Sequence, residues 1–170
     1  FNKICNNSYN VTFGTFHSYF FRIIRAYYKY DLNNILNDYE KTSIIKNIIS
    51  KNNISFDNEE EFIQAIINEI SFLKNELINP IFFNSNYTDS NTFSIIFKEY
   101  EDFKQENNKI DFDDMLIKCY NLIKKDENVR NFWKNKYKYI LIDEFQDINR
   151  VQYECIKMLI NDDENVFIVG

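Results

Sequence analysis

The stretch at 139–147, with the sequence YILIDEFQD, constrains the fold more than any other part of the chain. Its apolar run at 139–142 is rich in β-formers and ends abruptly, which is typical of a strand buried on both faces of a parallel sheet. Asp143 and Glu144 follow directly. Ligand and catalytic groups of open α/β sheets lie at the carboxyl ends of strands. An Asp there can hold Mg²⁺ on a nucleoside triphosphate, and a following Glu can polarise a water for attack on the γ-phosphate.

This stretch alone leaves a second interpretation open. Asp and Glu favour helix N-termini, so both acids could simply cap the next helix. The choice between a catalytic and a helix-capping role depends on the neighbouring residues and on residues far upstream.

The composition favours helices with polar connections. The 170 residues include 2 Gly and 1 Pro, so tight turns must rely on Asn and Asp. With 45% hydrophobic and 18% aromatic residues, the chain can bury a core and is not a disordered sequence.

The charge is acidic in sum but unevenly distributed. A net charge of −6 is not the bulk signature of a nucleic-acid-binding domain. Residues 1–30, however, contain no acid, and their bases are Lys3, Arg22, Arg25 and Lys29. A local basic face of this kind can bind phosphates while the rest of the surface stays acidic.

The spacing of the cysteines and the hydropathy of the chain are typical of a cytoplasmic protein. Cys5, Cys119 and Cys155 are widely spaced and form no CxxC pair, so we expect free thiols in a reducing, cytoplasmic environment. The sequence contains neither an apolar run long enough to span a membrane nor a signal-peptide pattern.

Hydrophobic spacing predicts a sheet interrupted by helices. A strand is predicted at 11–15, where Gly14 suggests a close backbone approach, and then a helix over 19–29 with Ser18 as its N-cap. From 31 to 128 the spacing is helical only, with helix starts predicted at Asp57 and Asp111.

In the C-terminal part, predicted helices alternate with predicted strands. A short helix is predicted over 128–136, a strand over 139–143, a helix over 153–160 and a last strand over 166–169. We therefore expect an α/β fold in which 1–30 and 129–170 form a parallel-sheet domain and 31–128 forms an all-helical insertion subdomain.

Four segments in this order resemble the UvrD/Rep/PcrA family of superfamily 1 DNA helicases. They are GTFHSYFFRIIR at 14–25, IDFDDML at 110–116, KYKYILIDEFQDINRVQY at 136–153 and NVFIVG at 165–170. The resemblance implies part of a RecA-like P-loop NTPase domain with its helical insertion. It also implies an ATP- and Mg²⁺-dependent motor that moves 3′ to 5′ on single-stranded DNA and unwinds duplexes at single-strand/duplex junctions.

The resemblance assigns roles to matching residues. Asp143 would hold Mg²⁺ through its water shell, Glu144 would be the general base, and Gln146 and Asp147 would couple the nucleotide site to neighbouring motifs. IDFDDML is more typical of a helix start than of a site, because Asp111 is a good N-cap.

The segment TFHS would contact single-stranded DNA, which needs an aromatic face for a base and short polar donors for the backbone. Thr15, Phe16, His17 and Ser18 supply both. His17, the only histidine, could instead be a structural histidine, and Arg22 and Arg25 could contact phosphates or form the solvated side of a core helix.

Two departures from the family pattern stand out. Ile148 occupies a position where the family usually has Thr, which removes a hydroxyl. The chain also lacks the P-loop pattern GxxxxGK[ST], since its only glycines are Gly14 and Gly170. We therefore expect a piece of a longer helicase that cannot hydrolyse ATP without the remainder of the helicase chain.

Two other functions remain open at the level of the sequence. The parent could be the helicase–nuclease subunit of a recombination complex, which shares these motifs. Alternatively, the chain could be a non-motor DNA-binding or interaction module that keeps the fold.

Overall fold

Helices dominate the structure, a computed structural model that describes residues 11–161 and 166–170. Lys3 and Cys5, named above, lie outside the described residues. The α-helices are α1 (Phe16–Tyr28), α2 (Asp38–Lys51), α3 (Glu59–Asn75), α4 (Ser90–Glu106), α5 (Phe112–Lys125), α6 (Glu127–Lys134) and α7 (Arg150–Leu159). Single 3₁₀ turns are η1 (Leu32–Asn34), η2 (Pro80–Phe82) and η3 (Phe145–Asp147).

A small parallel sheet is formed by β1 (Ile140–Ile142) and β2 (Val166–Ile168), with α7 in the connection between them. The register pairs Leu141 with Phe167. A strand, a helix and a parallel strand are the βαβ unit that the spacing at 139–169 predicts, so this part of the α/β prediction is confirmed.

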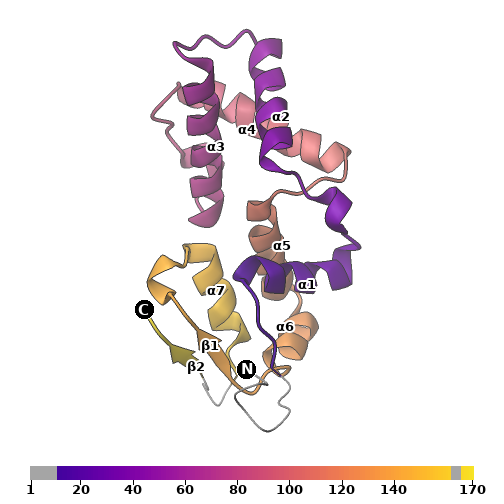
Figure 1. The fold of residues 1–170 in the computed structure, drawn as a ribbon. Coiled ribbons are helices and arrows are strands. Elements are labelled where there is room, and N and C mark those ends of the chain that lie inside the picture. Colours follow the sequence, from indigo (N-terminus) through magenta and orange to yellow (C-terminus); the bar gives the residue numbers. More distant parts are fainter. Residues whose placement is uncertain (1–10, 162–165) are drawn as a thin grey trace.

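The helices pack into two hydrophobic clusters, which Figure 1 shows as an upper part with α2, α3 and α4 and a lower part with α1, α5, α6, α7 and the sheet. Phe20 and Ile24 of α1 pack with Leu116 of α5 in the lower cluster. Ile45, Ile66 and Ile96 come together in the upper one. The chain enters and leaves the upper part side by side, since the Leu36 N–H donates to the Ile110 carbonyl at 2.8 Å. The domain division at 31 and 128 stays a prediction, although α5 packs in the lower cluster.

The predicted strand at 11–15 is wrong, because these residues have no regular secondary structure. They lead into a helix that begins at Phe16, earlier than predicted, with Thr15 and not Ser18 as its N-cap. Thr15 Oγ1 accepts from the Ser18 N–H at 3.3 Å, and Ser18 Oγ donates to the Thr15 carbonyl at 2.8 Å. The close approach predicted at Gly14 is to this hydroxyl, since a Cβ there would lie 2.4 Å from Ser18 Oγ.

Two helix starts were predicted in the insertion. Asp111 is the N-cap of α5 and forms a capping box with Asp114, which confirms that prediction. The start predicted at Asp57 is wrong by one residue: Asn58 caps α3, and its side chain accepts from the N–H groups of Glu60 and Glu61. Asn and Asp are nearly equivalent caps, so local pattern could not choose between the neighbours.

The expectation of a strand buried on both faces is also wrong. Ile142 is buried, but Leu141 is 74% exposed and its register partner Phe167 is 63% exposed. Both side chains lie on a face that no described segment covers. No helix within 11–161 has the length and hydrophobicity that a membrane crossing needs.

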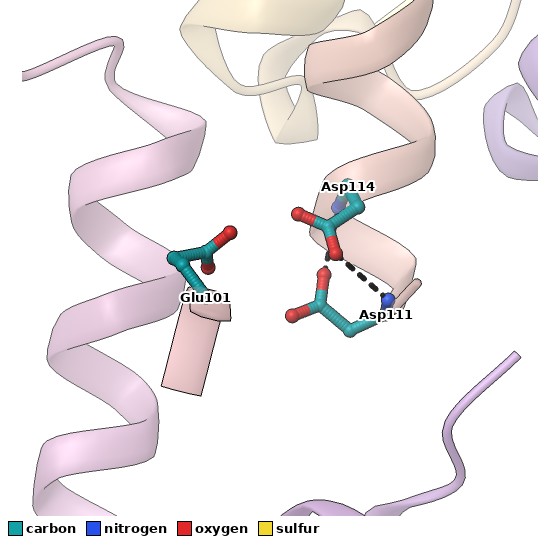
Figure 2. A group of neighbouring side chains, drawn as sticks. All are labelled: Glu101, Asp111 and Asp114. Atoms are coloured by element: carbon teal, nitrogen blue, oxygen red, sulfur yellow. Dashed lines mark hydrogen bonds between the residues drawn. The ribbon is translucent and has the colours of Figure 1, made fainter. Parts of the chain in front are cut away.

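A buried ion cluster joins the two parts at the start of α5. Lys74 of α3 and Lys104 of α4 lie between Asp111, Asp114 and Glu101, with Nζ–oxygen distances from 2.6 to 3.2 Å. Figure 2 shows the three carboxylates converging from α4 and α5. Burial alone would raise the pKa of Asp111, but the two ammonium groups outweigh it and hold that pKa well below its usual value. The same carboxylates raise the pKa of Lys74 well above its usual value against the effect of burial.

We expect Lys104→Met to destabilise the fold by about 3–5 kcal/mol, because it leaves buried carboxylates with too few cations. Urea unfolding of the 170-residue chain, followed by far-UV circular dichroism, measures this. Lys98→Met, at an exposed position of the same helix, is the matched control and should stay within about 0.5 kcal/mol of the unsubstituted chain. Equal midpoints for the two variants would contradict a stabilising role of the cluster.

Candidate nucleotide and DNA sites

The carboxylates of Asp143 and Glu144 lie at the carboxyl end of β1, and both residues are exposed. Glu144 stands at the N-cap position of η3 but makes no side-chain cap bond, and Asn149 is the N-cap of α7. Among the described residues, the bond that Asp143 Oδ1 accepts is local, from the Glu144 N–H at 3.1 Å. The helix-capping interpretation is therefore wrong, and the acids are exposed where a ligand can reach them.

Glu144 turns the chain away from the strand. Its backbone has φ 52° and ψ 46°, a left-handed conformation that costs a non-glycine residue about 1 kcal/mol or more. The Asp147 N–H donates to the Glu144 carbonyl at 3.0 Å, and Gln146 Nε2 donates to Glu144 Oε2. Gln146 therefore orients the Glu144 carboxylate directly.

The end of β2 supports the same turn. The Val169 N–H donates to the Ile142 carbonyl at 2.9 Å, and the Phe145 N–H donates to the Val169 carbonyl at 3.0 Å. Gly170 lies against Gln146, since a Cβ at Gly170 would be 2.1 Å from Gln146 Oε1. Any larger residue would displace the amide that holds Glu144, a constraint that the sequence analysis missed.

The chemistry of the exposed acids fits Mg²⁺. This ion keeps much of its water and is bound by one or two carboxylates together with phosphate oxygens. Glu101, Asp111 and Asp114 form the one group of three possible metal-ligating residues among the described residues. Lys74 and Lys104 already neutralise that group, so a second divalent site there is not supported.

The TFHS segment forms the first turn of α1. Thr15 and Ser18 are exposed but bonded to each other in the cap. Phe16 is half-buried, with its ring centroid 5.8 Å from that of Phe20. A more exposed aromatic, Phe13 at 70%, lies two residues before this segment, and the sequence analysis did not select it.

His17 lies against the start of α5. Its ring meets the ring of Phe112 edge-on, with 5.6 Å between centroids. Burial lowers the pKa of His17, and the charge of Asp113 opposes that shift. Arg22 and Arg25 are both exposed further along α1, so this helix presents cations beside the segment.

The start of α1 and the end of β1 both lie toward the upper part in Figure 1. The structure thus brings the two predicted groups of residues to one end of the lower part, on separate elements.

Comparison with known proteins identifies the family. A family model described as the UvrD/REP helicase N-terminal domain matches residues 2–170. The chain belongs to the UvrD/Rep helicase family. The resemblance found in the four sequence segments is confirmed.

Several similar proteins carry helicase names. The chain is 33% identical to a probable DNA helicase II homolog of Mycoplasma capricolum, with 99% of this chain and 24% of that protein covered. It is 32% identical to the ATP-dependent DNA helicase Rep of Buchnera aphidicola, covering 92% of this chain and 24% of that protein. For the ATP-dependent DNA helicase PcrA of Staphylococcus aureus the identity is 31%, over 92% of this chain and 22% of PcrA. The chain spans about a quarter of the length of these UvrD/Rep relatives.

The environment of His17 predicts its titration. As the only histidine, it gives one titrating imidazole signal in a proton NMR experiment on the 170-residue chain. We expect a pKa below 6.5 because burial disfavours the imidazolium. Asp113→Asn should lower the pKa of His17 further, because it removes the negative charge that favours the protonated ring.

Asp38→Asn is the control, since the side chain of Asp38 on α2 is 96% exposed and the substitution should leave the pKa of His17 unchanged. A higher pKa of His17 in Asp113→Asn would contradict this account of its surroundings.

Proposed function

We propose that this chain forms part of a RecA-like ATPase domain, with its helical insertion, in an ATP-dependent DNA helicase of the length of its relatives. The motor couples ATP hydrolysis to 3′–5′ movement on single-stranded DNA and unwinds duplexes at junctions. The observation that carries the proposal is the exposure of Asp143 and Glu144 at the carboxyl end of β1, within a chain that matches the helicase family over 2–170.

Asp143 would hold Mg²⁺ through its water shell, and the ion would supply positive charge beside the phosphate oxygens of ATP. Glu144 accepts a proton from the attacking water as general base. Gln146 keeps the Glu144 carboxylate in place through its amide, a role supported by their hydrogen bond. Asp147 follows in η3 and couples this turn to neighbouring motifs.

The remainder of the helicase supplies what this chain lacks. A P-loop surrounds phosphates with backbone N–H groups of a glycine-rich segment, and the 170 residues contain 2 glycines and no such pattern. ATP is therefore bound between this chain and other residues of the full-length protein. We place the protein in the cytoplasm, an assignment supported by the free, buried thiols of Cys119 and Cys155.

Single-stranded DNA binds along the start of α1. Phe16 and His17 provide aromatic surface, Thr15 and Ser18 provide polar atoms, and Arg22 contacts a phosphate. Phe16 is half-buried, which leaves part of its ring accessible to a base, and the exposed position of Arg22 supports the phosphate contact.

Glu144→Gln in the full-length protein should retain ATP binding and lower turnover by about 10²-fold or more, because the amide cannot take the proton. Steady-state ATPase rates and binding of a fluorescent ATP analogue measure both. Glu127→Gln, whose side chain is 75% exposed on α6, should be unaffected. The isolated 170-residue chain is the blank and should show no Mg²⁺-dependent turnover. Turnover retained in Glu144→Gln would remove Glu144 as the base.

Arg22→Glu in the full-length protein should weaken single-strand binding and reduce the slope of log affinity against log salt by about 1, because one phosphate contact is lost. Phe16→Ala should weaken binding with the slope unchanged, because stacking is uncharged. Fluorescence anisotropy with oligothymidylate at several salt concentrations measures both. Lys125→Glu, an exposed charge reversal at the end of α5, should have neither effect. The DNA-binding role of α1 fails if Arg22→Glu and Phe16→Ala both match the unsubstituted protein.

A further inference from the structure

Asp113 is a buried carboxylate held by neutral donors. It is 8% exposed, and Oδ1 accepts from Ser71 Oγ at 3.0 Å and from Asn75 Nδ2 at 2.9 Å. It forms no ion pair with any residue in the described ranges, unlike Asp111 and Asp114 on either side. A neutral amide could accept the same two bonds, so the charge of Asp113 bears on the direction of the hydrogen bonds and not on whether they form.

The bonds continue from Asp113 to the start of α7. Asn75 Oδ1 accepts from Asn149 Nδ2 at 2.9 Å. Asn149 Oδ1 in turn accepts from the Gln152 N–H at 2.9 Å as the N-cap of α7. One row of hydrogen bonds thus links α5, the last turn of α3 and the first turn of α7.

The charge of Asp113 sets the direction of this row. An ionised carboxylate only accepts, so Asn75 must turn its Nδ2 toward Asp113 and its Oδ1 toward Asn149. Asn149 must then donate Nδ2 to Asn75, which leaves Oδ1 for the helix cap. Each amide orientation follows from the one before it.

The row joins the two candidate sites. At one end, Asn149 caps α7 two residues after Asp147, where the loop that begins with Asp143 and Glu144 ends. At the other end, Phe112 packs on His17 of the DNA segment, and the charge of Asp113 acts on the same histidine. A shift of α1 on binding DNA would move the start of α5 and, through Asn75, the start of α7.

We propose that Asn75 and Asn149 are positioning residues that transmit the state of the DNA segment at the start of α1 to the acidic turn after β1. The inference rests on the proposed helicase function and adds a route by which single-stranded DNA stimulates ATP hydrolysis. Coupling through a few side chains typically changes an allosteric response by factors of a few to about 30-fold.

Asn149→Asp tests the row in the full-length protein. The new carboxylate still caps α7, because Asp and Asn are equally good N-caps, but it cannot donate to Asn75. We expect the ratio of oligothymidylate-stimulated to basal ATPase rate to fall at least about threefold, while far-UV circular dichroism shows that the fold is retained.

Asn58→Asp is the matched control. It makes the same chemical change at the N-cap of α3, where the bonds of the side chain within the described structure go to Glu60 and Glu61 of its own helix. The stimulation ratio of this variant should equal that of the unsubstituted protein.

Asp113→Asn/Asn149→Asp provides the rescue. Asn75 can then rotate its amide, donate to the carboxylate at 149 and accept from the amide at 113, so the row re-forms in the opposite direction with the same net charge. We expect the stimulation ratio to return to within about twofold of the unsubstituted value. Asp113→Asn alone should keep the ratio, because a row of three amides remains bonded.

The outcomes separate the two proposals. No stimulation of the unsubstituted protein by oligothymidylate would overturn the helicase function itself. Stimulation that is unchanged in Asn149→Asp, or not restored in the double variant, would overturn the positioning role and leave the helicase function standing.

Discussion

Two buried lysines shared by three carboxylates determine how the two parts of this molecule meet. Lys74 comes from α3 and Lys104 from α4, and both bond to Asp111 and Asp114 at the first turn of α5. A charge this deep is tolerated only beside opposite charges, so none of the three helices can shift without leaving an ion unpaired. The start of α5 is therefore placed by the upper helices, while the rest of α5 packs with the lower ones.

That placement organises the candidate sites as well. Phe112 and Asp113 lie between Asp111 and Asp114 in the sequence and contact different helices. The Phe112 ring packs on His17 of α1, and Asp113 bonds to Asn75 of α3. Asn75 reaches Asn149 beside the acidic turn. A segment that carries no catalytic group thus lies between the residues proposed to bind DNA and those proposed to act on ATP.

Local signals account for what the sequence predicted correctly. Asp111 as a cap and Asp143 and Glu144 after a strand depend on neighbours within a few residues. Errors arose where a distant partner decides. The residues at 11–15 find no strand to pair with in the described structure, and β1 lacks the cover on both faces that its apolar run led us to expect. The N-cap of α3 is Asn58 and not the predicted Asp57, because Asn and Asp have nearly equal N-cap propensities.

The sequence by itself determined the helicase family, the strand–helix–strand order at the C-terminal end and the position of the acidic pair, because motif spacing and periodicity are properties of the chain. Only the tertiary structure decided which distant groups meet. Lys74 and Lys104 neutralise the acids at the start of α5, Gly170 lies against the side chain of Gln146, and Asp113 bonds to Asn75. Asp113 and Asn75 are 38 residues apart, and no local pattern specifies which buried polar groups will satisfy one another across such separations.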